Sequence, residues 1–173
     1  MRYVFVMASA ILALLAVPRQ GRGASGDTIQ VVVSGGALTS PIVITDPTIA
    51  GRFMVGKGPG TGELHPDGTR TTDTSPSFII DWNRGVAHPP KGLSAYRVTF
   101  VIDRRNSGPY VAYYVVDPST QKGYVYLPGP QDPDYRSNVR LIYRKGIEGN
   151  WFYAWTAWED VVNPLIARVV AKQ

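Results

Sequence analysis

The stretch AYRVTFVIDRRNSGPYVAYYVVDPSTQKGYVYLPG, residues 95–129, decides the fold, because it holds three apolar runs separated by turn residues at hairpin spacing. In the first run, 95–103, apolar and polar residues alternate with a period of two, which is typical of a strand with one buried face. The second run, 110–117, is apolar on both sides and fits the middle of a sheet. The third run, 123–127, stops at Pro-Gly-Pro. Together these runs predict a three-stranded antiparallel meander.

Further extended segments are predicted on both sides of the meander. β-branched runs at 28–33 and 41–45 predict a hairpin, and Asp46 before Pro47 predicts one helical turn at 48–51. Between 137 and 144 the apolar spacing fits both a strand and a helix. We favour a strand, because Gly146 and Gly149 suit a hairpin loop between two strands. The remaining predicted strands are 52–55, 78–82, 139–143 and 151–155.

The C-terminal segment has helical spacing. Its apolar positions are Trp158, Val161, Val162, Leu165, Ile166 and Val169. Thr156 and Glu159 match a capping box at the start of this pattern. Pro164 lies inside the pattern and predicts a kink, or a restart of the helix with Asn163 as a new cap. The predicted fold class is therefore α+β: a mainly antiparallel β-sheet with a central three-stranded meander and a C-terminal amphipathic helix packed on one face.

The first 23 residues predict export. Arg2 precedes the largely apolar run 3–17, and Pro18 and a small-residue stretch follow, which is the order of a secretory signal peptide. Fifteen residues rise only about 22 Å as a helix, short of a hydrocarbon core of roughly 30 Å. We therefore predict a signal peptide at 1–23, a single β-rich globular domain at 24–173, a secreted or periplasmic location and no stable membrane span. An uncleaved N-terminal membrane anchor is the alternative, because Arg19 and Arg22 lie on the side to be exported.

Composition excludes several classes of function. The chain has 173 residues, a net charge of +5 and no cysteine, so disulfides and thiolate zinc sites are excluded. Three of the 18 basic residues lie in 1–23, which holds no acid, so the remainder carries 15 basic and 13 acidic residues. This near balance gives no support to a nucleic-acid partner.

Neither a phosphate-binding loop nor a histidine metal site is supported by the sequence. Gly51, Gly56 and Lys57 match the start of a phosphate-binding loop, but Gly58 stands where that loop needs Ser or Thr. The Gly-rich segment 56–77 is instead predicted to be one long surface loop. The two histidines, His65 and His88, lie in different loops without a recognised ligand spacing. No metal site and no cofactor is predicted.

No pair of carboxylates meets the geometry of general acid–base catalysis. Asp103 and Asp117 end two neighbouring antiparallel strands, so they lie roughly 20–25 Å apart at about 3.3 Å per residue. Glycosidase pairs stand within about 10 Å. Asp81 could approach either Asp103 or Asp117, but an Asp at a strand end is more often a turn residue. Glu148 in its Gly-flanked loop is the least explained acid.

Aromatic residues are the most suggestive feature, because eleven Tyr and Trp residues follow position 109. Most belong to the core, but a sheet cannot bury all of them, and those left on an open face beside arginines would form a platform for sugars or an anionic polymer. The predicted binding residues are Arg104, Arg105, Tyr113, Tyr126, Tyr135, Arg136 and Glu148. No catalytic residue is predicted.

These observations predict an exported, non-enzymatic binding or interaction module of the cell envelope that recognises a glycan or a partner protein. The first alternative is a hydrolase of a cell-envelope polymer that uses Asp81 or Glu148 with a loop histidine. A structural envelope protein is the second alternative.

Overall fold

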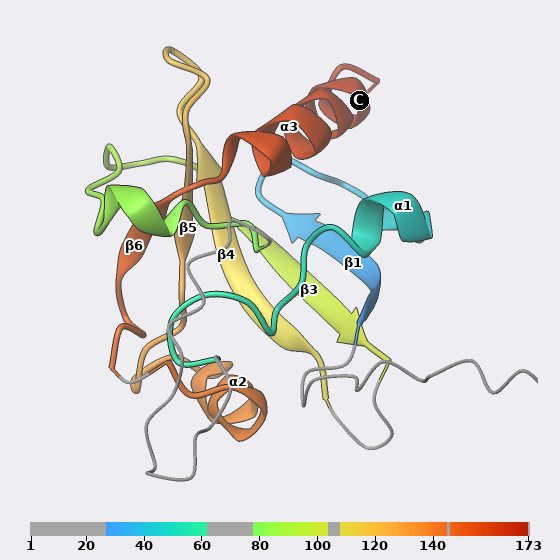
Figure 1. Cartoon of the computed structure of the whole chain (residues 1–173). Coiled ribbons are helices and arrows are strands. Elements are labelled where there is room, and N and C mark those ends of the chain that lie inside the picture. The colour runs from blue at the N-terminus through green and yellow to red at the C-terminus, as the bar shows by residue number, and fades with distance from the viewer. Residues whose placement is uncertain (1–26, 62–77, 104–107, 145, 173) are drawn as a thin grey trace, which may run out of the picture.

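A computed structural model describes residues 27–61, 78–103, 108–144 and 146–172. The predicted α+β class is confirmed: a six-stranded antiparallel sheet carries helix α3 on one face (Figure 1). The strand order is β2-β1-β3-β4-β5-β6. In chain order the elements are β1 (Thr28–Gly35), β2 (Ile42–Ile44), α1 (Pro47–Ala50), the 3-10 turn η1 (Trp82–Arg84), β3 (Tyr96–Ile102), β4 (Tyr110–Val116), β5 (Gly123–Tyr126), α2 (Tyr135–Leu141), β6 (Trp151–Tyr153) and α3 (Thr156–Val170).

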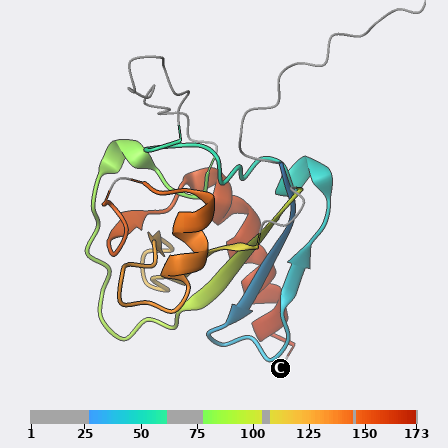
Figure 2. The ribbon, with the colours of Figure 1, turned by 90° about the horizontal axis from the view of Figure 1, so that it is seen from below.

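The meander is present as predicted, as β3, β4 and β5 in consecutive positions of the sheet. The predicted N-terminal hairpin is also confirmed, and it adds β1 to the free edge of β3. Helix α2 lies at the opposite end of the molecule from α3 (Figure 1, Figure 2). Within the described residues, no helix combines the length and the apolar composition that crossing a membrane requires.

The main core fills the space between the sheet and α3. Trp158 is fully buried, and its ring lies 5.0 Å from that of Phe53 and 6.0 Å from that of Tyr114 between centroids. Val162 and Ile166, one and two turns further along α3, continue the same buried stripe. The helical spacing recognised in the sequence therefore identifies the face of α3 that packs on the sheet.

The predicted strand at 139–143 is wrong, because α2 covers 135–141. The Asn138 side chain is buried, accepts a hydrogen bond from Val111 N (2.9 Å) and donates one to Val111 O (2.7 Å). β5 ends at Tyr126, opposite Tyr113, so it does not extend along β4 as far as Val111. The Asn138 side chain therefore pairs with the backbone of Val111 where a longer β5 would do so. Since 139–143 is not a strand, β6 lacks this predicted partner and pairs with β5 instead. A contact between residues 27 positions apart thus selects the helix.

The segments 52–55 and 78–82 are not strands either. Phe53, Phe78 and Ile79 are fully buried, so their side chains fill the core as expected, but the backbone is irregular apart from a single bridge of Ile80 to Ala154. These segments cover the core on the face that carries α3.

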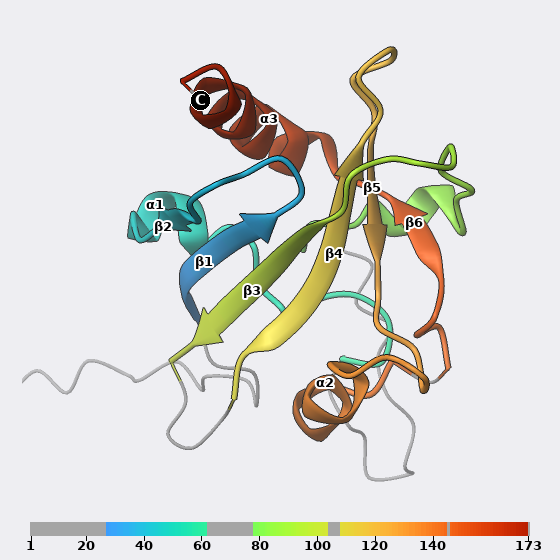
Figure 3. The same cartoon turned by 180° about the vertical axis from the view of Figure 1, so that it is seen from behind.

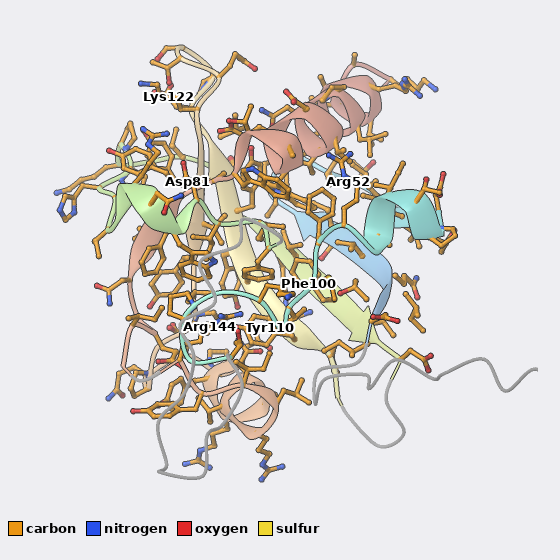
Figure 4. All side chains as sticks on the ribbon, viewed as in Figure 1. Arg52, Asp81, Phe100, Tyr110, Lys122 and Arg144 are labelled. Carbon is orange, nitrogen blue, oxygen red and sulfur yellow. The ribbon has the colours of Figure 1, made fainter. Side chains whose placement is uncertain are left out.

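The buried side chain of Arg144 holds the 55–59 segment in place (Figure 4). Its Nη2 donates to Val55 O (2.7 Å), its Nη1 to Lys57 O (3.0 Å) and Pro59 O (3.1 Å), and its Nε to Tyr110 Oη (3.2 Å). The guanidinium also lies 5.1 Å from the ring centroid of Trp82. Three carbonyls of this segment face a cation, whereas a phosphate-binding loop presents N–H groups to an anion. The phosphate-loop interpretation therefore stays excluded.

The capping box predicted for α3 is wrong. Trp155 is the N-cap and makes no side-chain cap, while Glu159 turns away and accepts a hydrogen bond from Gly123 N. The helix runs through Pro164 as one element, and the Asn163 side chain accepts a hydrogen bond from Tyr114 Oη (2.7 Å) instead of capping a new helix.

The contact of Glu159 predicts a pH dependence. Burial raises the pKa of Glu159 above its ordinary value of 4.5, more than the Gly123 hydrogen bond lowers it. The folded state therefore binds this proton more tightly than the unfolded state, so this group's contribution to stability falls as pH rises above about 4.5. Glu159→Gln keeps an acceptor for Gly123 N, and we expect it to flatten the dependence of unfolding free energy on pH between acidic and neutral solution. Urea denaturation across that range tests this, with exposed Asp103→Asn as the control. A pH dependence of Glu159→Gln unchanged from that of wild type would contradict it.

Both edges of the sheet are short or occupied. β2 has only three residues and lies between Pro41 and Pro47. The outer edge of β6 is bridged at Phe152 by Val86 and continued by the Ile80–Ala154 bridge.

Candidate functional site: an aromatic row on the open face

Figure 3 shows the sheet from the face opposite α3. This face carries a row of partly exposed aromatic residues across three strands. Tyr113 of β4 lies directly opposite Tyr126 of β5, which lies directly opposite Trp151 of β6. The ring centroids are 6.4 Å apart for the first pair and 5.1 Å apart for the second. We call these three residues the aromatic row. Arg97 of β3 continues it on the other side of Tyr113.

Two aspartates of the segment between β5 and α2 hold the tyrosine hydroxyls. Tyr126 Oη donates to Asp132 Oδ2 (2.7 Å), and Tyr113 Oη donates to Asp134 Oδ2 (2.8 Å). Arg97 makes a bidentate pair with Asp134, from Nη2 to Oδ1 (2.7 Å) and from Nε to Oδ2 (3.3 Å). The rings are therefore fixed at both ends, by the strand backbone and by a carboxylate, before any ligand arrives.

The electrostatics agree with this assignment of donors. The hydrogen bond from Arg97 is the largest effect that holds the pKa of Asp134 below its ordinary value, and the Tyr113 hydroxyl adds to it. Burial raises the pKa of Tyr113, and the neighbouring Asp134 raises it further. Burial, with the bond to Asp132, raises the pKa of Tyr126 to about 12. Both hydroxyls therefore stay protonated at neutral pH and donate to carboxylate oxygens.

A second row on the same face is covered. Val115, Tyr124 and Tyr153 lie opposite one another on β4, β5 and β6, but Ala87 and Leu93 of the segment between η1 and β3 pack over this cluster. Figure 3 shows that segment crossing the face near the end of the sheet away from α2. The guanidinium of exposed Arg84 lies 3.6 Å from the ring centroid of Tyr153. The partly exposed aromatic row lies between this covering segment and α2, and Trp151 at its end also packs against the covered cluster.

The structure brings together two of the predicted binding residues, Tyr113 and Tyr126. Tyr135 begins α2 and is half-buried, and Arg136 beside it is exposed. Glu148 turns back on its own loop and accepts hydrogen bonds from Arg144 N (2.6 Å) and Gly146 N (3.0 Å). The predictions for Arg104 and Arg105 lie outside the described residues.

The carboxylates considered for hydrolysis have local backbone partners. Asp81 caps η1 by accepting a hydrogen bond from Asn83 N (3.2 Å), and Asp117 accepts from Ser119 N (2.9 Å) in the β4–β5 turn. His88 is exposed, and His65 lies outside the described residues. Among the described residues, no three His, Cys, Asp or Glu side chains are grouped so that they could hold a metal ion.

Sequence reasoning missed Arg97, Asp132 and Asp134, and did not select Trp151. Arg97 could have been found, because the register of a β3–β4 hairpin places it opposite Tyr113. The two aspartates carried no such signal, since a Pro- and Asp-rich segment is typical of any loop.

No protein-family model matches this chain, and neither a curated protein nor a solved structure matches it.

Proposed function

We propose that this protein is an exported, non-enzymatic binding module that recognises a glycan of the cell envelope through the aromatic row. The observation that carries the proposal is the alignment of Tyr113, Tyr126 and Trp151 on one partly exposed face, with the two tyrosine hydroxyls fixed by Asp132 and Asp134. The export component rests on the signal-peptide pattern of residues 1–23.

A sugar matches both chemical components of this surface. A pyranose ring has an apolar C–H face, which packs on an aromatic ring, and a rim of hydroxyls, which need hydrogen-bond partners once water is removed. The aromatic row offers the rings, and the neighbouring carboxylates offer acceptors. A protein partner would favour a contiguous apolar patch. The large exposed hydrophobic residues of the described chain, Ile29, Val43, Val86, Tyr143 and Val170, include no member of the row.

The proposal predicts the effect of Trp151→Ala on binding. We expect affinity for the retained polysaccharide to fall by about tenfold or more, because burying a large apolar side chain is worth about 1.5–3 kcal/mol. Tyr143→Ala is the matched control, since Tyr143 is 55% exposed and lies outside the row. The measurement is affinity electrophoresis on a panel of envelope polysaccharides, with melting curves to show that each variant is folded.

The same incubations separate binding from hydrolysis. Release of reducing ends that disappears in Asp81→Asn or Glu148→Gln would contradict a non-enzymatic module. Equal retention by wild type and Trp151→Ala would place the binding surface elsewhere.

A further inference from the structure

Of the charged groups in contact with the aromatic row, some have a partner of opposite charge and one does not. Arg97 and Asp134 neutralise each other through a bidentate pair. Asp132 accepts only from neutral donors, Tyr126 Oη and Gly129 N, each at 2.7 Å. The polar margin of the row therefore carries a net negative charge.

Asp132 also keeps one oxygen for a ligand. Both of its hydrogen bonds go to Oδ2, and no donor in the described part of the chain contacts Oδ1. The side chain is partly exposed and is fixed by the hydroxyl of Tyr126, the central ring of the row. A carboxylate oxygen held in this way accepts hydrogen bonds strongly, because ionised acceptors bind donors about twice as well as neutral ones.

Resting on the proposed function, we infer that the aromatic row selects a neutral, hydroxyl-rich saccharide, and that Asp132 is a specificity-determining residue that accepts a ligand hydroxyl through Oδ1. The Asp132 carboxylate also selects against polymers that carry uronate or phosphate groups. Their anions would approach an uncompensated carboxylate, while the charge of Arg97 is already neutralised by Asp134. Arg84 does not offset this, since its guanidinium stacks on Tyr153 in the covered row.

The test is Asp132→Asn. Asparagine keeps one oxygen for Tyr126 and Gly129, and it replaces the free acceptor by an N–H donor. The probes are neutral gluco-, manno- and N-acetylglucosamine oligosaccharides, with polygalacturonate as the carboxylated counterpart. Asp160→Asn, an exposed acid on α3, is the matched control, and melting curves check that both variants fold.

We expect wild type to bind at least one neutral probe, with an affinity that high salt leaves unchanged, and to bind polygalacturonate more weakly. Asp132→Asn should lower the affinity for the neutral probe about tenfold or more, which is the effect expected for the loss of a hydrogen bond to a charged group. Asp132→Asn should also bring the affinities for the neutral and the carboxylated probes closer together. Asp160→Asn should change neither affinity.

The outcomes separate this inference from the proposed function. The inference about Asp132 is overturned if wild type prefers polygalacturonate, or if Asp132→Asn binds the neutral probe as wild type does. The proposed function stands in either case if Trp151→Ala still abolishes retention. Binding of a neutral probe that Trp151→Ala leaves intact overturns both, and so does the failure of every probe to bind.

Discussion

Replacing Arg144 by leucine is expected to lower the free energy of unfolding by about 3–5 kcal/mol. Arg144 is fully buried, and its guanidinium donates to three carbonyls, of Val55, Lys57 and Pro59, and to the Tyr110 hydroxyl. Leucine fills part of the volume but leaves these acceptors without donors, and each unsatisfied buried group costs about 1–3 kcal/mol. Water that enters to replace the guanidinium would offset part of this sum. Urea denaturation at neutral pH measures the difference.

Two variants make the Arg144 result specific. Arg144→Lys retains the charge but not the planar fork that reaches several acceptors at once, so we expect it to be almost as unstable as Arg144→Leu. Arg140→Leu removes an exposed arginine from α2 and should change stability by less than about 0.5 kcal/mol. If Arg144→Leu melted within about 1 kcal/mol of wild type, the guanidinium would not hold the 55–59 segment in place.

Val162→Asp should destabilise the fold by a similar amount, about 3–5 kcal/mol, because it places a carboxylate without a partner between α3 and the sheet. Val162 is fully buried, whereas Val170 on the same helix is 38% exposed, so Val170→Asp is the matched control and should cost less than about 1 kcal/mol. The pKa of the introduced carboxyl should rise on burial, so the penalty should shrink as the pH falls. Thermal melts of both variants at neutral and acidic pH test this; equal melting of the two would show that α3 is not docked by this face.

Much of the fold could be predicted from the periodic spacing of apolar residues along the chain. In 95–103 the period-two alternation is unambiguous, and β3 has Tyr96, Val98 and Phe100 buried as it requires. Segment 137–144 fits two periods equally well, and the choice depends on Asn138 meeting Val111, a partner that no local pattern identifies. Segments 52–55 and 78–82 are apolar enough for strands, but Arg144 and the N-terminal end of α3 take their backbone carbonyls instead, as in the bond from Trp155 N to Ile79 O.

The candidate site could likewise be predicted only in part from the sequence. Tyr113 and Tyr126 were identifiable because aromatic residues in excess of the core must reach a surface. Their exposure relative to that of Tyr124 could not be identified, since the segment 85–95 covers Tyr124 and leaves Tyr113 and Tyr126 partly exposed. The position of Asp132 and Asp134 over the sheet depends on the path of the chain from β5 to α2, which has no periodic signature.

The way the sheet ends bears on how this protein behaves at high concentration. An unpaired strand edge is a template on which other chains add, and it leads to fibres when it is long and flat. Here the backbone groups of β6 already pair with residues around Ile80 and Val86, and β2 offers only three residues between two prolines. A domain with many β-branched and aromatic residues thus presents little edge to a neighbouring copy. Its surfaces can carry exposed rings without recruiting further chains into the sheet.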